Sequence, residues 1–456
     1  MGYFTKYTIG TQGDARMYVF SENKNLPAYI FMTVIVSLFL GLMISAEELI
    51  KDRRILKREK FLHLSRSSYL NSKIMILFGI SAIQALSYVL IGNAILENSA
   101  MNWRYWIVFF TAACTSNLIG LNISSALNSV VTIYILIPFI LVPQILLSGV
   151  IVKFSDLHRN IASPVYVPVT GDLMLSRWAY EALAVAQFKD NRYQRFFFKS
   201  EQKMSENLYL YGYLVPRLQS KVDGCERMLT TQNKGVEFVQ DVTIIRNEME
   251  LLSEKFLDAI PIPFLGTITT EKFDPIQAQN LRKTLANLKI YFNKEYVDAA
   301  VQKDSLVKMF KRIYGENAVV QFKQKYHNKY LADMMTNKLE VDKILEFDDR
   351  LIQMTDLVYK MPDFQNGRAH YYAPFKNIKG VKIDTFWFNV MALWLFTGFF
   401  YILLYFDVLR KIVNYYDVVL IIRRNVKLKW IESRNFMFAI QNKKHQHSQN
   451  NKTEEI

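Results

Sequence analysis

The residues best suited to specific chemistry lie in a charged segment after the first apolar stretch. Within residues 45–59, acidic and basic side chains are interleaved. Glu48 and Asp52 are four residues apart, as are Arg54 and Arg58, so one helix would present an acidic patch beside a basic one. Such a helix suits docking onto another protein, because charge pairs set register and partner choice. The alternative is a solvated loop whose charges only fix membrane topology.

No pattern typical of catalysis or phosphate binding occurs in the sequence. It contains no H-E-x-x-H, no G-x-S-x-G and no G-x-x-x-x-G-K-(S/T). The last of these is the loop whose backbone amides cradle nucleotide phosphates. The six histidines do not cluster except in the polar tail, at His445 and His447. We therefore predict that the chain is not an enzyme and has no catalytic residue, metal or cofactor of its own.

Several uncharged polar residues interrupt the apolar runs. The favoured interpretation is hydrogen bonding between membrane helices, and the alternative is a translocation path lined by Asn117, Asn122 or Gln144. A proton-driven carrier normally needs an ionisable residue inside the membrane. Because the apolar runs contain no ionisable residue, we expect the energy for any transport to come from a part of the protein outside the membrane.

Long apolar segments must position these residues. Residues 25–46, 74–96, 105–152 and 385–406 contain no charged side chain, and about 20 apolar residues cross a bilayer. These runs, together with 14% aromatic residues, exclude a disordered chain and argue against a wholly soluble one. A polar stretch at residues 120–129 is expected to form a tight turn within the longest run. We predict five spans, at 28–45, 74–96, 106–127, 130–152 and 385–406.

The net charge of +15 is unevenly distributed. Residues 46–73 carry +4 and residues 407–456 carry +5, whereas the much longer segment 153–384 carries only +5. Since Lys and Arg accumulate on the cytoplasmic side, the first two segments are predicted to be cytoplasmic and 153–384 extracytoplasmic. The basic tail is expected to follow the anionic leaflet rather than bind nucleic acid.

Five spans place residues 1–26 outside the cytoplasm, although no signal peptide precedes them. A preceding helix in a longer polypeptide is favoured over unaided translocation. The extracytoplasmic segment 153–384 is long enough for its own core. From about residue 275 to 361, apolar residues recur at helical steps, which favours two to five helices. Turns are expected at Gly212, Pro216, Gly224 and Gly235.

A further stretch with helical spacing follows the fourth predicted span, at residues 173–189. A helix with Trp and Tyr near a membrane end is often an interfacial anchor. The residues concerned are Arg177, Trp178, Tyr180 and Glu181.

Three motifs resemble ABC-2 type exporters of the ABCG-like group. The first is Glu48, then Asp52–Glu59 (DRRILKRE), then Tyr69 and Lys73, which follow the order of that family's first loop. The second is Pro143–Gly149 (PQILLSG), similar to the family's P-x-x-x-x-x-G at the end of a span. The third is Ser176–Leu183 (SRWAYEAL). The chain is most similar to membrane subunits of ABC-2 type transporters from Bacteroidetes-like bacteria, over residues 1–190 and 380–410.

The resemblance implies an α-helical exporter bundle in the inner (plasma) membrane, with a mainly helical extracytoplasmic insertion. Residues 46–60 would form a connecting helix that meets an ATP-binding subunit or an upstream ATP-binding domain, where ATP and Mg²⁺ bind. Two such membrane halves would pair. A complete family member has six spans, so the resemblance implies that the first would be missing here. The implied coupling residues are Glu48, Asp52, Arg53, Arg54, Arg58 and Glu59.

For the helix at residues 173–189, the resemblance implies a gate-side element packed against the preceding span. The function implied for the whole chain is the permease part of an ATP-driven exporter. A competing hypothesis is a non-transporting membrane sensor or adaptor that uses residues 153–384 to bind a partner.

Overall fold

The computed structural model describes residues 18–58, 65–158, 163, 165–232, 234–256, 265–363 and 366–415. The predictions made for Glu59, for residues 1–17 and for the tail beyond Tyr415 lie outside these residues, as do the side chains of Arg53 and Arg54. Which segments face the cytoplasm stays a prediction.

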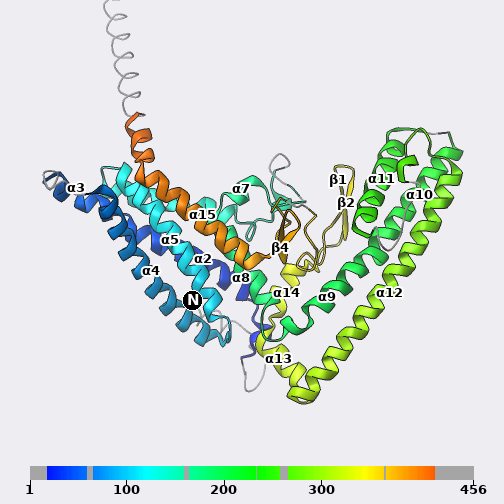
Figure 1. Cartoon of the computed structure of the whole chain (residues 1–456), viewed down its shortest axis with the longest axis horizontal. Helices are drawn as coiled ribbons and strands as arrows, with labels where there is room; N and C mark the ends of the chain where they lie inside the picture. The colour runs from blue at the N-terminus through cyan, green and yellow to red at the C-terminus, as the bar shows by residue number, and fades with distance from the viewer. Residues whose placement is uncertain are drawn as a thin grey trace, which may run out of the picture.

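Figure 1 shows a V with two helical limbs, an apolar bundle and an elongated arm. The bundle contains η1 (Phe20–Glu22), α2 (Leu26–Ser45), α3 (Glu48–Arg58), α4 (Arg66–Leu96), α5 (Asn102–Ala126), α6 (Val130–Leu146), η3 (Phe154–Asp156), α7 (Val169–Asp172), α8 (Leu175–Lys189) and α15 (Thr385–Tyr405). The arm contains α9 (Gln194–Tyr209), the π turn η4 (Leu210–Leu214), α10 (Val215–Thr230), α11 (Val236–Phe256), η5 (Leu265–Thr267) and α12 (Pro275–Tyr314). Between the limbs lie α13 (Ala318–Tyr326), α14 (Lys329–Thr336) and the strands β1 (Ile344–Phe347), β2 (Arg350–Gln353), β3 (Phe375–Ile378) and β4 (Val381–Asp384).

Four helices of the described chain, α2, α4, α5 and α15, are long and apolar enough to cross a membrane. Helix α4 begins at Arg66 instead of residue 74, because the charged turns that carry Arg66 and Lys73 continue the same helix. Helix α6 is shorter, ends at Leu146 and contains Pro138 and Pro143. The predicted span at 130–152 is therefore only partly helical, and five crossings remain a prediction.

The expected turn at residues 120–129 is wrong for most of its length, since α5 continues to Ala126. Its polar side chains bond to their own helix instead of breaking it. The Asn122 amide donates to Leu118 O at 2.8 Å, and the Ser125 hydroxyl donates to Asn122 O at 2.8 Å. The break before α6 is confined to residues 127–129.

Helix α5 is the centre of the bundle and packs against α2, α4, α8 and α15. Small residues let two of these backbones approach closely. A Cβ atom on Gly41 of α2 would lie 2.6 Å from Ala113 O of α5. One on Gly120 of α5 would lie 3.0 Å from Leu42 O of α2. The α2–α5 contact is thus fixed by two glycines, one on each helix.

The arm has its own apolar core, formed by η4, α10, α11 and α12 with Leu351 of β2. The turns expected at Gly212, Pro216 and Gly224 are wrong, because α9, η4 and α10 run on without a loop. Pro216 lies in the first turn of α10, two residues after the π turn, where the α-helical hydrogen-bond ladder is already interrupted. Gly235 does lie at a break, just before α11.

Two short hairpins were not predicted from the sequence. Strand β1 pairs antiparallel with β2, with Phe347 opposite Arg350, and β3 pairs with β4, with Ile378 opposite Val381. The second hairpin leads directly into α15, because Asp384 ends β4 and its side chain caps the helix by accepting a hydrogen bond from Phe386 N. The chain therefore enters α15 directly from β4.

Candidate functional site

Helix α3 is held against one end of the bundle by its apolar face. Leu49 is buried in a cluster with Leu70 of α4 and Leu118 and Leu121 of α5. The free backbone amides at the start of α3 are also satisfied by α5, since Leu49 N and Ile50 N both donate to the Ser124 hydroxyl at 3.2 Å. This end of α3 is fixed to the bundle by packing and by hydrogen bonds.

The acidic face of α3 is bound to α4 through one lysine. Lys73 Nζ lies 3.0 Å from Glu48 Oε2 and 2.9 Å from Asp52 Oδ2. The Tyr69 hydroxyl donates to Asp52 Oδ2 at 2.8 Å. The two predicted coupling residues Glu48 and Asp52 therefore have partners within the chain, and we call this group, Glu48, Asp52, Tyr69 and Lys73, the α3 clamp.

The remaining described side chains of α3 face away from the clamp or lie at the surface. Ile55 is 52% exposed, and Arg58 is exposed. At the start of the segment, Glu47 pairs with Lys51 at 2.7 Å and accepts a hydrogen bond from the Tyr134 hydroxyl of α6. An exposed apolar residue beside an exposed base is a surface on which another protein can dock.

The asparagines predicted as pathway residues make hydrogen bonds between helices. Asn117 of α5 donates to the Ser81 hydroxyl of α4 at 2.8 Å. Asn122 donates to Phe400 O of α15 at 2.9 Å. The third residue, Gln144 of α6, accepts from Ser176 N at 3.0 Å and so connects α6 to the first turn of α8. None of the three lines the pocket described next.

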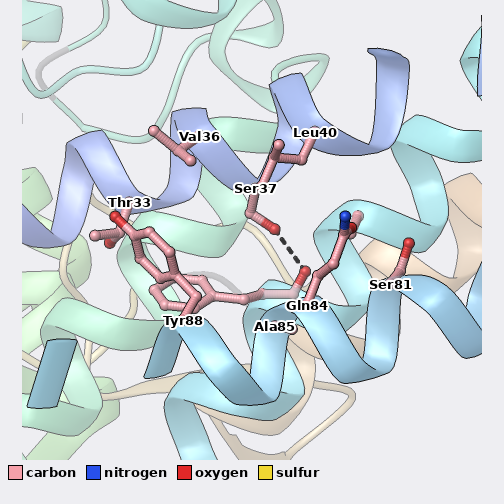
Figure 2. Close-up of a pocket in the computed structure, with 10 residues that line it drawn as sticks. Thr33, Val36, Ser37, Leu40, Ser81, Gln84, Ala85 and Tyr88 are labelled. Carbon is pink, nitrogen blue, oxygen red and sulfur yellow. Dashed lines mark hydrogen bonds between the residues drawn. The ribbon is translucent and has the colours of Figure 1, made fainter. Parts of the chain in front are cut away.

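A small pocket of about 20 Å³ opens between α2, α4 and α5. Figure 2 shows Thr33 and Ser37 of α2 on one side and Ser81, Gln84 and Tyr88 of α4 on the other. The Ser37 hydroxyl donates to the backbone oxygen of Phe109 in α5 at 2.7 Å, and the lining carries no charged side chain. The signal was present in the sequence, because these residues recur at three- and four-residue steps and so share one face of each helix.

At the opposite side of the bundle, α8 carries a buried group of charges. Arg177, Glu181 and Lys376 are 1%, 0% and 2% exposed. Glu181 Oε2 lies 2.9 Å from Arg177 Nη1, and its Oε1 lies 2.7 Å from Lys376 Nζ. Asn389 of α15 donates to Glu181 Oε2 at 2.9 Å, and Arg177 also pairs with Asp172. We call these five residues the α8 charge cluster.

In the α8 charge cluster, the buried acidic and basic side chains offset one another's cost of burial. Burial alone would raise the pKa of Glu181, but the adjacent charges of Lys376 and Arg177 lower it, with further help from hydrogen bonds, and the net shift is downward. Burial lowers the pKa of Lys376, and Glu181 partly opposes that shift. The cluster joins α8, β3 and α15. Sequence reasoning found Arg177 and Glu181 but missed Lys376, a single base in a short strand.

The other two residues predicted on this helix are Trp178, which packs against Arg177, and Tyr180, which packs against α2. The guanidinium of Arg177 lies 3.4 Å from the ring centre of Trp178, whose indole N–H donates to Asp172 O at 2.8 Å. Tyr180 is buried and meets the ring of Phe31 in α2 edge-on at 5.7 Å. Three of the four residues predicted for this helix, Arg177, Tyr180 and Glu181, are thus held inside the protein.

Comparison with known families matches residues 1–188 to the ABC-2 type transporter, a membrane-domain family. The match covers α2 to α6 and almost all of α8, so it contains the α3 clamp and the pocket between α2, α4 and α5. It confirms, at the level of the family, the resemblance inferred from the motifs in this part of the chain. No curated protein and no solved structure was found to match the chain.

Proposed function

We propose that the chain is the permease part of an ATP-driven exporter in the inner membrane, and that its ATP-binding partner docks on α3. The family match over residues 1–188 supports a permease component, and members of this membrane family generally work with an ATP-binding subunit. The observation that carries the proposal is the two-sided character of α3. One face is bound to the bundle, and the other exposes Ile55 and Arg58.

The two faces of α3 would have different roles in coupling, one in binding the ATPase and the other in transmitting its movement to α4. Ile55 and Arg58 contact the partner, with Arg53, Arg54 and Glu59 of the same segment as further candidates. Glu48 and Asp52 transmit the movement of α3 to α4 through Lys73. The paired carboxylates are therefore force-bearing contacts within the permease, whereas the exposed base selects the partner by charge.

Movement of α4 against α2 would act on the pocket between them. Its lining combines hydroxyls and one carboxamide with apolar side chains and carries no charge, so no ion pair would hold a substrate there. A second membrane half, a copy of this chain or a related one, would complete the path. Helix α8 would act beside the gate, because Ser176 joins it to the end of α6.

The competing function, a membrane sensor or adaptor that does not transport, draws on the arm, which has a core of its own. The two proposals differ at the pocket. In an exporter, filling the pocket by Ser37→Leu slows substrate-dependent ATP turnover while the partner remains bound. In a sensor, the same change leaves the turnover of the complex unaltered.

The coupling proposal is tested on the full chain, purified with its bound ATPase from native membranes and returned to vesicles. Arg58→Glu should release the ATPase. Lys73→Met should retain it but disconnect its turnover from the permease. Arg312→Glu on the exposed side of α12 makes the same charge change far from α3 and serves as the matched control. Unchanged ATPase binding in Arg58→Glu together with unchanged turnover in Lys73→Met would falsify the proposal.

A further inference from the structure

The arm contains a polar cavity that the proposed transport function does not use. Its walls are α9 and the π turn η4 on one side, α11 on the other, and β2 with residues 360–363 at the base. The volume is about 380 Å³, within the range of about 300–1,000 Å³ typical of small-molecule sites.

An acidic and a basic side chain in this cavity, Glu248 and Arg350, are incompletely paired. Glu248 of α11 is buried, and its Oε1 accepts a hydrogen bond from Leu351 N at 2.9 Å. Arg350 Nε lies 3.8 Å from that oxygen and is buried with no hydrogen-bond partner. Among the described residues, this long ion pair is the only charge contact of the Arg350 guanidinium. Its donors are therefore available to a ligand.

The wall facing Arg350 is irregular in a way that often accompanies binding sites. Tyr209 lines the cavity at the end of α9, and its buried hydroxyl has no hydrogen-bond partner. The π turn Leu210–Leu214 follows immediately, and single π turns inside helices occur frequently at functional sites. An orphaned hydroxyl and an interrupted helix both reduce stability, so their coincidence at one cavity points to a use.

The charges of the lining restrict the chemistry of the ligand. Lys255 already pairs with Glu206, and Lys360 pairs with Asp363 at 3.1 Å. This leaves Arg350 as the available cation and Glu248 and Glu254 as the available carboxylates. The guanidinium fork matches a carboxylate. A dianion such as phosphate would meet an excess of negative charge, because the lining holds four carboxylates, those of Glu206, Glu248, Glu254 and Asp363, against three bases, Lys255, Arg350 and Lys360.

We propose that this cavity binds a small zwitterion, an amino acid or a short peptide. The ligand carboxylate binds the guanidinium of Arg350, and the ligand ammonium group lies between Glu248 and Glu254. The inference goes beyond the transport function and does not depend on it, since binding in the arm requires neither ATP nor the partner on α3.

The test uses the full chain in nanodiscs and calorimetric titration with L-alanyl-L-alanine. Saturable binding is expected, with at least a tenfold loss when the peptide is N-acetylated or C-amidated. Arg350→Gln should abolish binding. Arg350→Lys, which retains the charge but loses the fork, should weaken it about tenfold. Arg246→Gln removes an exposed base of α11 that does not line the cavity, and this variant should bind as the parent chain does.

Folding is checked in the same preparations by thermal unfolding. If Arg350→Gln fails to fold, Glu248→Gln replaces it, because the amide oxygen still accepts the hydrogen bond from Leu351 N. The proposal is overturned if the dipeptide does not bind, or if capped and free dipeptides bind equally. It is also overturned if the folded Arg350 or Glu248 variants bind as the parent chain does. Binding of inorganic phosphate in place of the dipeptide would also overturn it.

Discussion

The α3 clamp and the α8 charge cluster use the same side-chain chemistry in opposite surroundings. In the clamp, Lys73 is 25% exposed, and it holds two carboxylates that are 30% and 22% exposed. In the cluster, Glu181 and its two bases are almost entirely removed from solvent. A partly exposed ion pair is screened and weak, whereas a buried charge that loses its partner is expensive.

This difference in burial determines which of the two groups of contacts can rearrange. The clamp can be broken and remade at small free-energy cost, as a coupling element needs. The α8 charge cluster can be dismantled only at a cost comparable to much of a domain's stability. It is therefore suited to hold α8, β3 and α15 as one body while other parts of the bundle shift.

The largest effect is expected for Lys376→Met. The change leaves the buried Glu181 carboxylate with one base fewer, and removing one partner of a buried ion pair costs about 3–5 kcal/mol. Reversible unfolding of the purified chain in detergent measures the loss. A loss below about 1 kcal/mol would show that solvent reaches the cluster, and the contrast with the clamp would disappear.

The next effect is a partial rescue. Adding Glu181→Met to Lys376→Met removes the orphaned carboxylate, so the double variant should recover about 1–3 kcal/mol of the loss. The same unfolding measurement on Lys376→Met, on Glu181→Met and on the double variant completes a double-mutant cycle. Additive losses would mean that Glu181 and Lys376 do not interact across their 2.7 Å contact.

A smaller effect on stability is expected for Lys73→Met in the clamp. The loss should be about 1 kcal/mol or less, because both ion pairs are partly exposed. Its effect on ATP turnover should nevertheless be large, since the charged link between α3 and α4 is then lost. Unfolding and turnover are measured on one preparation. A stability loss as large as that of Lys376→Met would contradict the division between movable and fixed contacts.

The smallest effect is expected for Arg66→Gln. Arg66 pairs with Asp407 at 2.5 Å between α4 and the end of α15, but its side chain is 51% exposed. The stability change should stay within about 0.5 kcal/mol and vanish at high salt. Unfolding at low and high ionic strength checks this. A salt-independent loss would place Arg66 in the same class as Lys376.

Composition alone predicted most of the bundle. The ends of α2, α5 and α15 lie within a few residues of the predicted spans, because long charge-free runs have few alternatives to a helix. The start of α4 was missed, since charges at Arg66 and Lys73 were read as the end of a loop. The polar turn at residues 120–129 was wrong, because Asn122 and Ser125 bond within the helix.

The site was less predictable where its partners lie far apart in the sequence. The acid–base spacing in α3 located the helix, but the pairing of Glu48 and Asp52 with Lys73 depends on where α4 packs. Glu181 and Lys376 are separated by 195 positions. Their contact depends on the β3–β4 hairpin, whose turn at Lys379–Gly380 requires two residues with positive φ. Such a short hairpin has no periodic pattern of apolar residues by which the sequence could reveal it.

Helix α4 is an uninterrupted rod of 31 residues, about 46 Å long at 1.5 Å per residue. Lys73 lies near one end, Gln84 and Tyr88 lie further along, and the Asn117–Ser81 hydrogen bond holds the rod to α5 between them. In the proposed coupling, α4 would act as a rigid lever that pivots near Ser81. A short stroke at α3 would then swing the pocket side of α4 in the opposite direction, without any bending of the helix.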